Sequence, residues 1–129
     1  MTRWILALGI VCAEAAAAHA GSVRMVVADM PYARVWAAVL EAVRDYPIER
    51  IAEGEIMTGW RDRPARADEP GFERGADRVR LQVEVLGERI TRITVTAEGR
   101  GWRDGGWVSV GDAEPLERDV LARIRAALS

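Results

Sequence analysis

The stretch RVRLQVEVLGERITRITVTA, residues 78–97, decides the fold of this 129-residue chain. Valine, leucine and isoleucine alternate here with charged or polar residues on both sides of a turn at Gly87-Glu88. Alternation with a period of two gives a strand one face for a core and one face for solvent. Because a short, glycine-containing turn joins two such strands, we predict an antiparallel hairpin.

A helix near the end of the chain is predicted from about Pro115 onward. Its apolar residues recur at helical spacing and form one stripe: Leu116, Val120, Leu121, Ile124 and Leu128. Acidic residues cluster near its start and arginines near its end, as the helix dipole favours. We expect its charged residues to face water: Glu117, Arg118, Asp119, Arg123 and Arg125.

The segments around the hairpin show further helix and strand patterns. A helix is expected after Asp29, whose side chain could cap it, and Pro47 stops it after Tyr46. Trp36 lies on the apolar stripe of this helix, so it is expected in the core. Strands are expected at residues 23–27, 48–52, 55–60 and, as a last edge strand, 107–110.

Two segments lack any period. Residues 62–76 contain several prolines, glycines and charges, and we expect a long mobile loop there. Within it, Asp68 and Glu69 are adjacent, but we interpret them as solvated surface carboxylates rather than a catalytic pair. Residues 99–106 are rich in glycine without matching a phosphate-binding loop, so a β-turn or bulge between two strands is expected.

The predicted order is therefore a strand, a helix, four or five antiparallel strands and a final helix. Each alternating strand has one face to bury, and two amphipathic helices are available to cover it. We predict an α+β fold of the helix-grip type, in which a curved antiparallel sheet packs on the C-terminal helix. Residues 21–129 have a length typical of a single domain.

The first twenty residues have the pattern of a cleaved secretory signal peptide. Arg3 precedes an apolar run over residues 4–11, and Ala18-His19-Ala20 has small side chains where signal peptidase requires them. A membrane-spanning helix needs roughly 20 apolar residues, and Glu14 interrupts this stretch early. We therefore expect an exported, periplasmic protein that starts at Gly21, without a transmembrane span, either soluble or peripherally associated with the outer membrane.

Cleavage after Ala20 would remove the only cysteine, Cys12, and the only histidine, His19. Val11 precedes Cys12 where lipid attachment needs a small residue, so a lipid anchor is not expected. The remaining chain has no lysine either, because every basic residue is arginine. Catalysis by Ser–His or Cys–His pairs and zinc or copper sites on these residues are then excluded. We expect no enzymatic activity, no cofactor and no metal, and the net charge of −2 does not indicate a nucleic-acid partner.

Four aromatic residues are candidates for an interaction surface: Trp60, Phe72, Trp102 and Trp107. Trp60 ends a predicted strand just before the predicted loop, Phe72 is the aromatic residue of that loop, and the other two flank the glycine-rich turn. Tryptophan and arginine are favoured at the hot spots of protein interfaces. Tryptophan also seals the ends of small cores, and the sequence leaves both interpretations open.

Residues 32–40, YARVWAAVL, and residues 54–60, GEIMTGW, resemble BamC-like (NlpB-type) helix-grip domains. The arginine-rich hairpin strands and the closing helix, LARIRAAL at residues 121–128, are similar as well. The resemblance implies a helix-grip fold and a non-enzymatic envelope protein that works by protein contact, linked to outer-membrane assembly or maintenance. Unlike BamC, this chain has a single domain and no lipobox cysteine.

Two functions are compatible with the sequence. The first is an interaction module of the cell envelope, which uses the sheet edge and residues 62–76 to contact a protein partner. The second is a carrier that holds a small apolar ligand or lipid between the sheet and the terminal helix. The apolar stripe of that helix disfavours a carrier, because a small core needs all of it. A cavity of several hundred Å³ beneath the helix would favour one.

Overall fold

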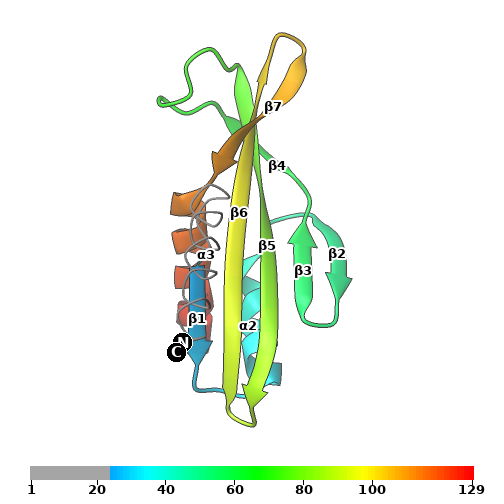
Figure 1. Cartoon of the computed structure of the whole chain (residues 1–129), viewed down its shortest axis with the longest axis vertical. Coiled ribbons are helices and arrows are strands. Elements are labelled where there is room, and N and C mark those ends of the chain that lie inside the picture. The colour runs from blue at the N-terminus through cyan, green and yellow to red at the C-terminus, as the bar shows by residue number, and fades with distance from the viewer. Residues whose placement is uncertain (1–23) are drawn as a thin grey trace, which may run out of the picture.

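The computed structural model describes residues 24–129, so the predicted signal peptide, Gly21 and the first residue of the predicted opening strand lie outside the described part. The elements are β1 (Arg24–Ala28), α2 (Tyr32–Ala42), β2 (Ile48–Ala52), β3 (Glu55–Thr58), β4 (Arg61–Pro64), β5 (Arg74–Gly87), β6 (Ile90–Arg103), β7 (Gly106–Asp112) and α3 (Glu114–Leu128). One curved antiparallel sheet contains all seven strands (Figure 1). The predicted α+β architecture is confirmed, with β4 as an additional strand. Neither helix of residues 24–129 is long and apolar enough to cross a membrane.

The predicted hairpin forms the centre of the sheet. β5 and β6 are each 14 residues long and pair antiparallel, with Leu81 opposite Val95. The strand order is β1-β6-β5-β3-β2, while β4 also pairs with β5 and β7 also pairs with β6. Because the two central strands are so long, each has two neighbours on its outer side, one near the hairpin turn and one at the far end.

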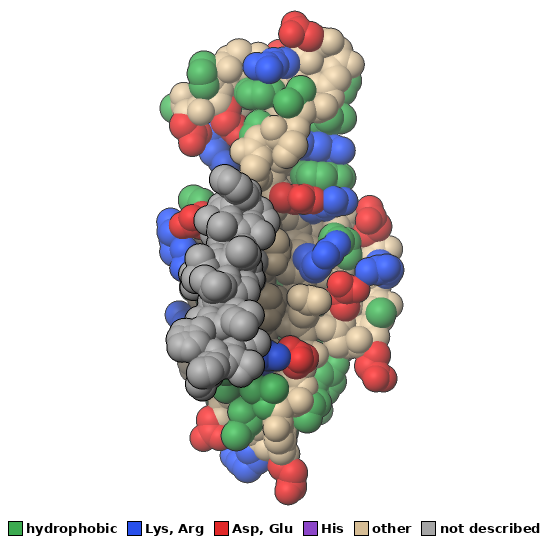
Figure 2. All heavy atoms as spheres, in the orientation of Figure 1, with side chains coloured by type: hydrophobic (Ala, Val, Ile, Leu, Met, Phe, Trp, Pro, Cys, Tyr) green, Lys and Arg blue, Asp and Glu red, His purple; other side chains and the backbone are tan. Residues whose placement is uncertain are grey.

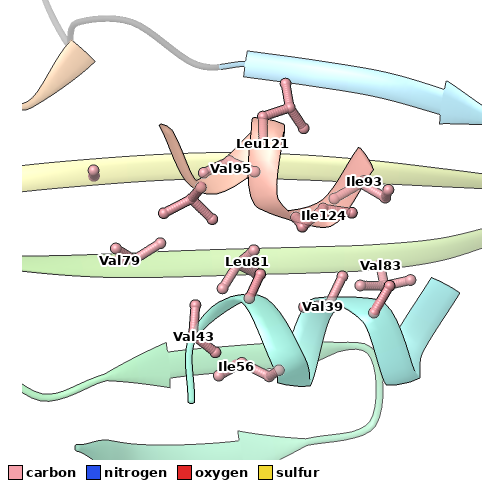
Figure 3. Packing of buried hydrophobic residues seen from close by; sticks show 14 of the residues in the cluster. Val39, Val43, Ile56, Val79, Leu81, Val83, Ile93, Val95, Leu121 and Ile124 are labelled. Carbon is pink, nitrogen blue, oxygen red and sulfur yellow. The ribbon is translucent and has the colours of Figure 1, made fainter. Parts of the chain in front are cut away.

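The two helices cover one face of the sheet near the hairpin turn. In Figure 3, Leu121 and Ile124 of α3 lie over β6, and Val39 and Val43 of α2 lie over β5 and β3. The alternating residues of the hairpin that face them are almost fully buried: Val79, Leu81, Val83, Ile93 and Val95. The predicted apolar stripe of the terminal helix therefore fills the core. Trp36 was expected there, but it is only partly buried and stacks on Tyr32 at the edge of the core.

The helices are much shorter than the strands they cover. A helix of 15 residues such as α3 spans about 22 Å, whereas a strand of 14 residues such as β5 or β6 spans about 46 Å. The far end of the sheet therefore projects beyond both helices (Figure 1). We call this part the sheet extension; it consists of β4, β7, residues 74–77 of β5 and residues 98–103 of β6.

The sheet extension corrects two sequence predictions. The predicted loop at residues 62–76 is shorter, because both of its ends belong to strands and only residues 65–73 connect β4 to β5. The predicted turn at residues 99–106 is shorter as well, since β6 continues through Gly99 and Gly101 to Arg103. Only Asp104-Gly105 turn the chain, with φ values of 51° and 76°, as a two-residue hairpin loop requires.

Helix and strand ends also differ from the prediction. The helix α2 begins after Pro31, whose fixed φ suits the position, so Asp29 does not cap it. It ends at Ala42 rather than Tyr46, because Val43 already has non-helical backbone, with φ −112° and ψ 17°, and Pro47 has no N–H to bond the carbonyl of Val43. The strand β3 ends at Thr58, two residues before Trp60.

Glu117 was expected to face water, yet its side chain is fully buried under the sheet. Its Oε2 accepts a hydrogen bond of 2.9 Å from the backbone N–H of Ala97 on β6. On this side of β6, β1 pairs with residues 91–95 and β7 with residues 98–103, so Ala97 lies in the gap between the two strands. The buried carboxyl group accepts the hydrogen bond that a neighbouring strand would otherwise accept from Ala97. The pattern of charges along the helix does not reveal this role.

Replacing Glu117 by alanine should lower the free energy of unfolding by about 1–3 kcal/mol, because the N–H of Ala97 is left buried without an acceptor. Glu117→Gln keeps an acceptor and should cost less. Asp119→Ala is the matched control on the same helix, since its exposed ion pair with Arg123 is worth about 0.5 kcal/mol or less. Urea unfolding measures all three; equal losses for Glu117→Ala and Asp119→Ala would contradict the role assigned to Glu117.

Candidate functional site

The sheet extension brings three of the four candidate aromatic residues together on one face. Trp102 of β6 lies opposite Trp107 of β7 in the strand register, and their rings meet edge to face with centroids 5.3 Å apart. Trp60 directly precedes β4. Because Arg61 pairs with Asp77, Trp60 lies beside Arg78, on the same face of the sheet as the other two tryptophans. These tryptophans were separate candidates in the sequence, and in the structure they form one surface.

Arginine side chains lie between the tryptophan rings. The guanidinium carbon of Arg100 is 4.1 Å from the ring centre of Trp60 and 4.2 Å from that of Trp107. Arg74 lies 4.9 Å from Trp102 and 5.3 Å from Trp107. We call the series Trp102, Arg74, Trp107, Arg100, Trp60 and Arg78 the tryptophan–arginine ladder. Figure 2 shows blue and green side chains next to one another along the right side of the sheet extension.

Strand alternation explains how the ladder assembles. Odd-numbered residues of the hairpin face the helices, so even-numbered residues point to the opposite face, and the register pairs Arg74 with Trp102 and Arg78 with Glu98. Each contact between a guanidinium group and an indole ring is worth roughly 0.5–1 kcal/mol at an exposed site and about 2 kcal/mol when desolvated. The flat guanidinium group stacks well on a ring, which the ammonium group of lysine does not.

The charges of the ladder are only partly balanced within the chain. Arg78 donates a hydrogen bond from its Nε to Glu98. By contrast, Arg74 and Arg100 form no ion pair with a carboxylate of residues 24–129, and their guanidinium groups lie over the indole rings. The Nε of Arg100 is buried without a hydrogen-bond partner. An open hollow of about 270 Å³ lies here, lined by Trp60, Arg78, Glu98, Gly99, Arg100, Trp107 and Ser109.

Phe72, the fourth candidate, lies on the other face of the sheet extension. A β-carbon at Gly101 would be 2.4 Å from its ring, so the aromatic ring packs directly on the backbone of β6. Arg103 lies over the same ring at 4.8 Å. On this face Gly75 makes room for Arg63 in the same way. These glycines therefore allow residues 65–73 to pack closely on the strands, which explains why a glycine-rich segment forms a strand rather than a turn.

Ion pairs hold residues 65–73 against this second face. Arg63 donates to Glu69 at 2.8 and 3.0 Å and to Asp77 at 2.9 Å. Arg66 adds a contact of 3.2 Å to Asp77, and its backbone N–H donates to Glu69 at 3.0 Å. Glu69 and Asp77 are each only 8% exposed. The prediction of a solvated Glu69 is therefore wrong, because the two-pronged contact with Arg63 compensates its burial.

The same contacts shift the pKa values of Glu69 and Arg63. Hydrogen bonds from Arg63 lower the pKa of Glu69, and hydrogen bonds to Glu69 raise the pKa of Arg63. This network holds residues 65–73 in place, and the lowered pKa favours the ionised form of Glu69. Within residues 24–129, no group of three or more His, Cys, Asp or Glu side chains is placed to hold a metal ion.

The space between the sheet and α3 gives a carrier function no support. Val120 and Ile124 are fully buried and Leu121 is 6% exposed, so the helix face that would line a ligand cavity is in contact with the core. A hollow of about 400 Å³ lies beside this helix at the surface, and it is lined by charged residues such as Glu41 and Arg123. A polar surface hollow does not suit an apolar ligand.

The sequence matches no protein-family model and no curated protein. The candidate site is therefore defined by its geometry. The sequence indicated its tryptophans but not its arginines. Arg74, Arg78 and Arg100 do lie at alternate strand positions, but the glycines between them interrupt the strand pattern that would have revealed a shared face.

The lowered pKa of Glu69 predicts a specific pH dependence of stability. Because the folded state binds a proton at Glu69 less readily than the unfolded chain, this residue stabilises the fold above its unfolded pKa. The contribution is lost as the pH falls through the lower, folded pKa. Urea unfolding from neutral to acidic pH should show a steeper loss of stability for the wild type than for Glu69→Gln. Parallel pH profiles for the two proteins would contradict this assignment, and Asp68→Asn, an exposed neighbour, is the control.

Proposed function

We propose that this chain is a non-enzymatic interaction module of the cell envelope and that the tryptophan–arginine ladder is the surface on which it holds a protein partner. The observation that carries the proposal is the concentration of Trp60, Trp102 and Trp107 with unbalanced arginines on one exposed sheet face. Tryptophan and arginine contribute the largest binding energies at protein interfaces. The rings are already held by stacking, so little side-chain entropy is lost when a partner binds.

The place of the ladder in the fold supports a binding function over a purely structural one. Core stability comes from the hydrophobic cluster beneath α2 and α3. Strand alternation places the ladder on the opposite face, at the end of the sheet that projects beyond both helices (Figure 1). All three tryptophan residues are partly exposed. A sheet end that served only to complete the core would not need a second aromatic layer on its outer face.

The cellular location is proposed from the N-terminal sequence. The pattern of residues 1–20 supports export to the periplasm, where the protein would be soluble or peripherally associated with the outer membrane. The resemblance to BamC-like domains supports the same compartment and a role linked to outer-membrane assembly or maintenance. Neither a thiol nor an imidazole follows Ala20, which supports a function without catalysis.

A photo-activatable amino acid at Ser109, an exposed residue beside the ladder, should cross-link to one discrete envelope protein in the cells that encode this chain. The same group at Gln82, exposed on the same sheet face near the hairpin turn, is the positional control and should not give that product. Trp60→Ala should weaken partner binding by roughly 30-fold or more, while the unfolding free energy falls by only about 1–2 kcal/mol.

Two results would contradict the proposal. If Ser109 and Gln82 give the same products, or Trp60→Ala leaves the cross-link unchanged, the ladder is not the binding surface. Thermal unfolding of each variant shows whether a lost cross-link reflects lost structure. Phe72→Ala tests the other face of the sheet extension and should leave the cross-link from Ser109 in place.

Export predicts a defined N-terminus. Protein recovered from the envelope fraction should have the mass of residues 21–129, since small side chains at Ala18 and Ala20 permit cleavage after Ala20. Ala20→Leu, which introduces a large side chain at the cleavage site, should leave the uncleaved mass in the membrane fraction. A wild-type chain that keeps residues 1–20 and remains in the cytosol would contradict both export and the proposed compartment.

A further inference from the structure

The strand β7 is an open sheet edge beside the ladder. Among the strands of residues 24–129, β7 pairs with β6 and has no neighbour on its other side. Exposed edges usually carry charged residues or proline, which prevent another chain from pairing with them. The strand β4, at the opposite edge of the sheet extension, has this protection in its sequence Arg-Asp-Arg-Pro. Residues 106–110 of β7, Gly-Trp-Val-Ser-Val, have none of it.

The open edge is long enough to receive an added strand. A register shift separates the pairs Gly99–Gly111 and Arg100–Ser109, and Gly111 has a φ of 90°, so a bulge ends the regular part of β7. Residues 106–109 remain as a regular edge of about 14 Å. Peptides that add a strand to a sheet edge gain affinity from backbone hydrogen bonds and specificity from alternate side chains.

The ladder supplies the side-chain chemistry for such a peptide. Ser109 lies opposite Arg100 in the register, and both face the ladder side of the sheet. A residue of an added strand opposite Ser109 would lie about 10 Å from the backbone of Arg100, two strand spacings away. Because serine is small, a glutamate at that position can extend over Ser109 toward the guanidinium group. Arg100 has no carboxylate partner among residues 24–129, so the charges are complementary.

We propose that β7 binds an extended acidic segment of the partner as an additional strand, with a carboxylate of that segment paired to Arg100. This inference rests on the proposed function and adds the partner's conformation and charge. The hollow between Trp60 and Trp107 receives the acidic side chain, and the backbone of β7 between Gly106 and Ser109 receives the strand. Indole rings on both sides of Arg100 exclude water from the pair, which strengthens it.

The test uses two synthetic peptides, one of alternating threonine and glutamate and one with glutamine in place of each glutamate. Titration of the purified protein, followed by tryptophan fluorescence, should give a Kd at least about tenfold lower for the glutamate peptide. Arg100→Gln should remove this preference, so that both peptides bind this variant equally. Backbone hydrogen exchange of Trp107 and Ser109, whose N–H groups point away from β6 in the strand register, should slow when the glutamate peptide is bound.

Two further variants distinguish a specific effect on binding from a loss of structure. Ser109→Asp leaves every ladder residue in place but offers Arg100 a carboxylate of the chain itself, and it should weaken the glutamate peptide more than the glutamine peptide. Arg92→Gln removes an arginine that pairs with Glu84 on the same face, far from β7, and should leave both affinities unchanged. Far-ultraviolet circular dichroism confirms that each variant is folded.

Three results would overturn the inference: equal affinities of the two peptides, unchanged hydrogen exchange in β7, or an acidic polysaccharide that competes fully without protecting β7. The last result would assign the ladder to anionic glycans. If the peptides fail while the cross-link from Ser109 still depends on Trp60, only the acidic-strand inference is wrong. If that cross-link also fails, the proposed function itself is wrong.

Discussion

The length of the central hairpin is the constraint on which the rest of the structure depends. Its two strands span about 46 Å, and a helix of 15 residues covers about half of that distance. Near the hairpin turn, the helices and the sheet share one hydrophobic core. At the far end, neither α2 nor α3 covers either face of these strands. Both faces of the sheet extension are therefore stabilised by side chains of the strands themselves and of the connection at residues 65–73.

The two faces of the sheet extension meet this need with different chemistry. On one face, indole rings and guanidinium groups stack in alternation. On the other face, Arg63 binds two buried carboxylates, and the ring of Phe72 packs on the backbone at Gly101. The second face is thus occupied by the chain's own connection, residues 65–73, whereas the first remains open to solvent. Residues 65–73 thus support the sheet extension on its second face, while the ladder lies on the face that stays exposed.

Sequence patterns predicted the parts of the fold in which each residue follows a simple rule. Alternation predicted the hairpin around Leu81 and Val95, and helical spacing predicted the core face of α3. The strand positions of Gly99 and Gly101 could not be predicted, because they depend on side chains from residues 63–72 that pack on them. Glu117 was misassigned for a related reason, since its role depends on a gap between two strands. The tryptophans of the site were identified as candidates, but their arginine partners become evident only in the register of the paired strands.

The ladder also bears on how the chain finds its correct strand alignment. A hairpin paired one residue out of step would turn each side chain of one strand to the opposite face. Near the turn, such a slip would expose Leu81 or Val95 and would be penalised by the core. At the far end, it would separate Arg74 from Trp102 and carry Arg100 away from its rings. The stacked side chains therefore favour the native register at the end of the hairpin that the helices do not cover, about ten residues from the turn.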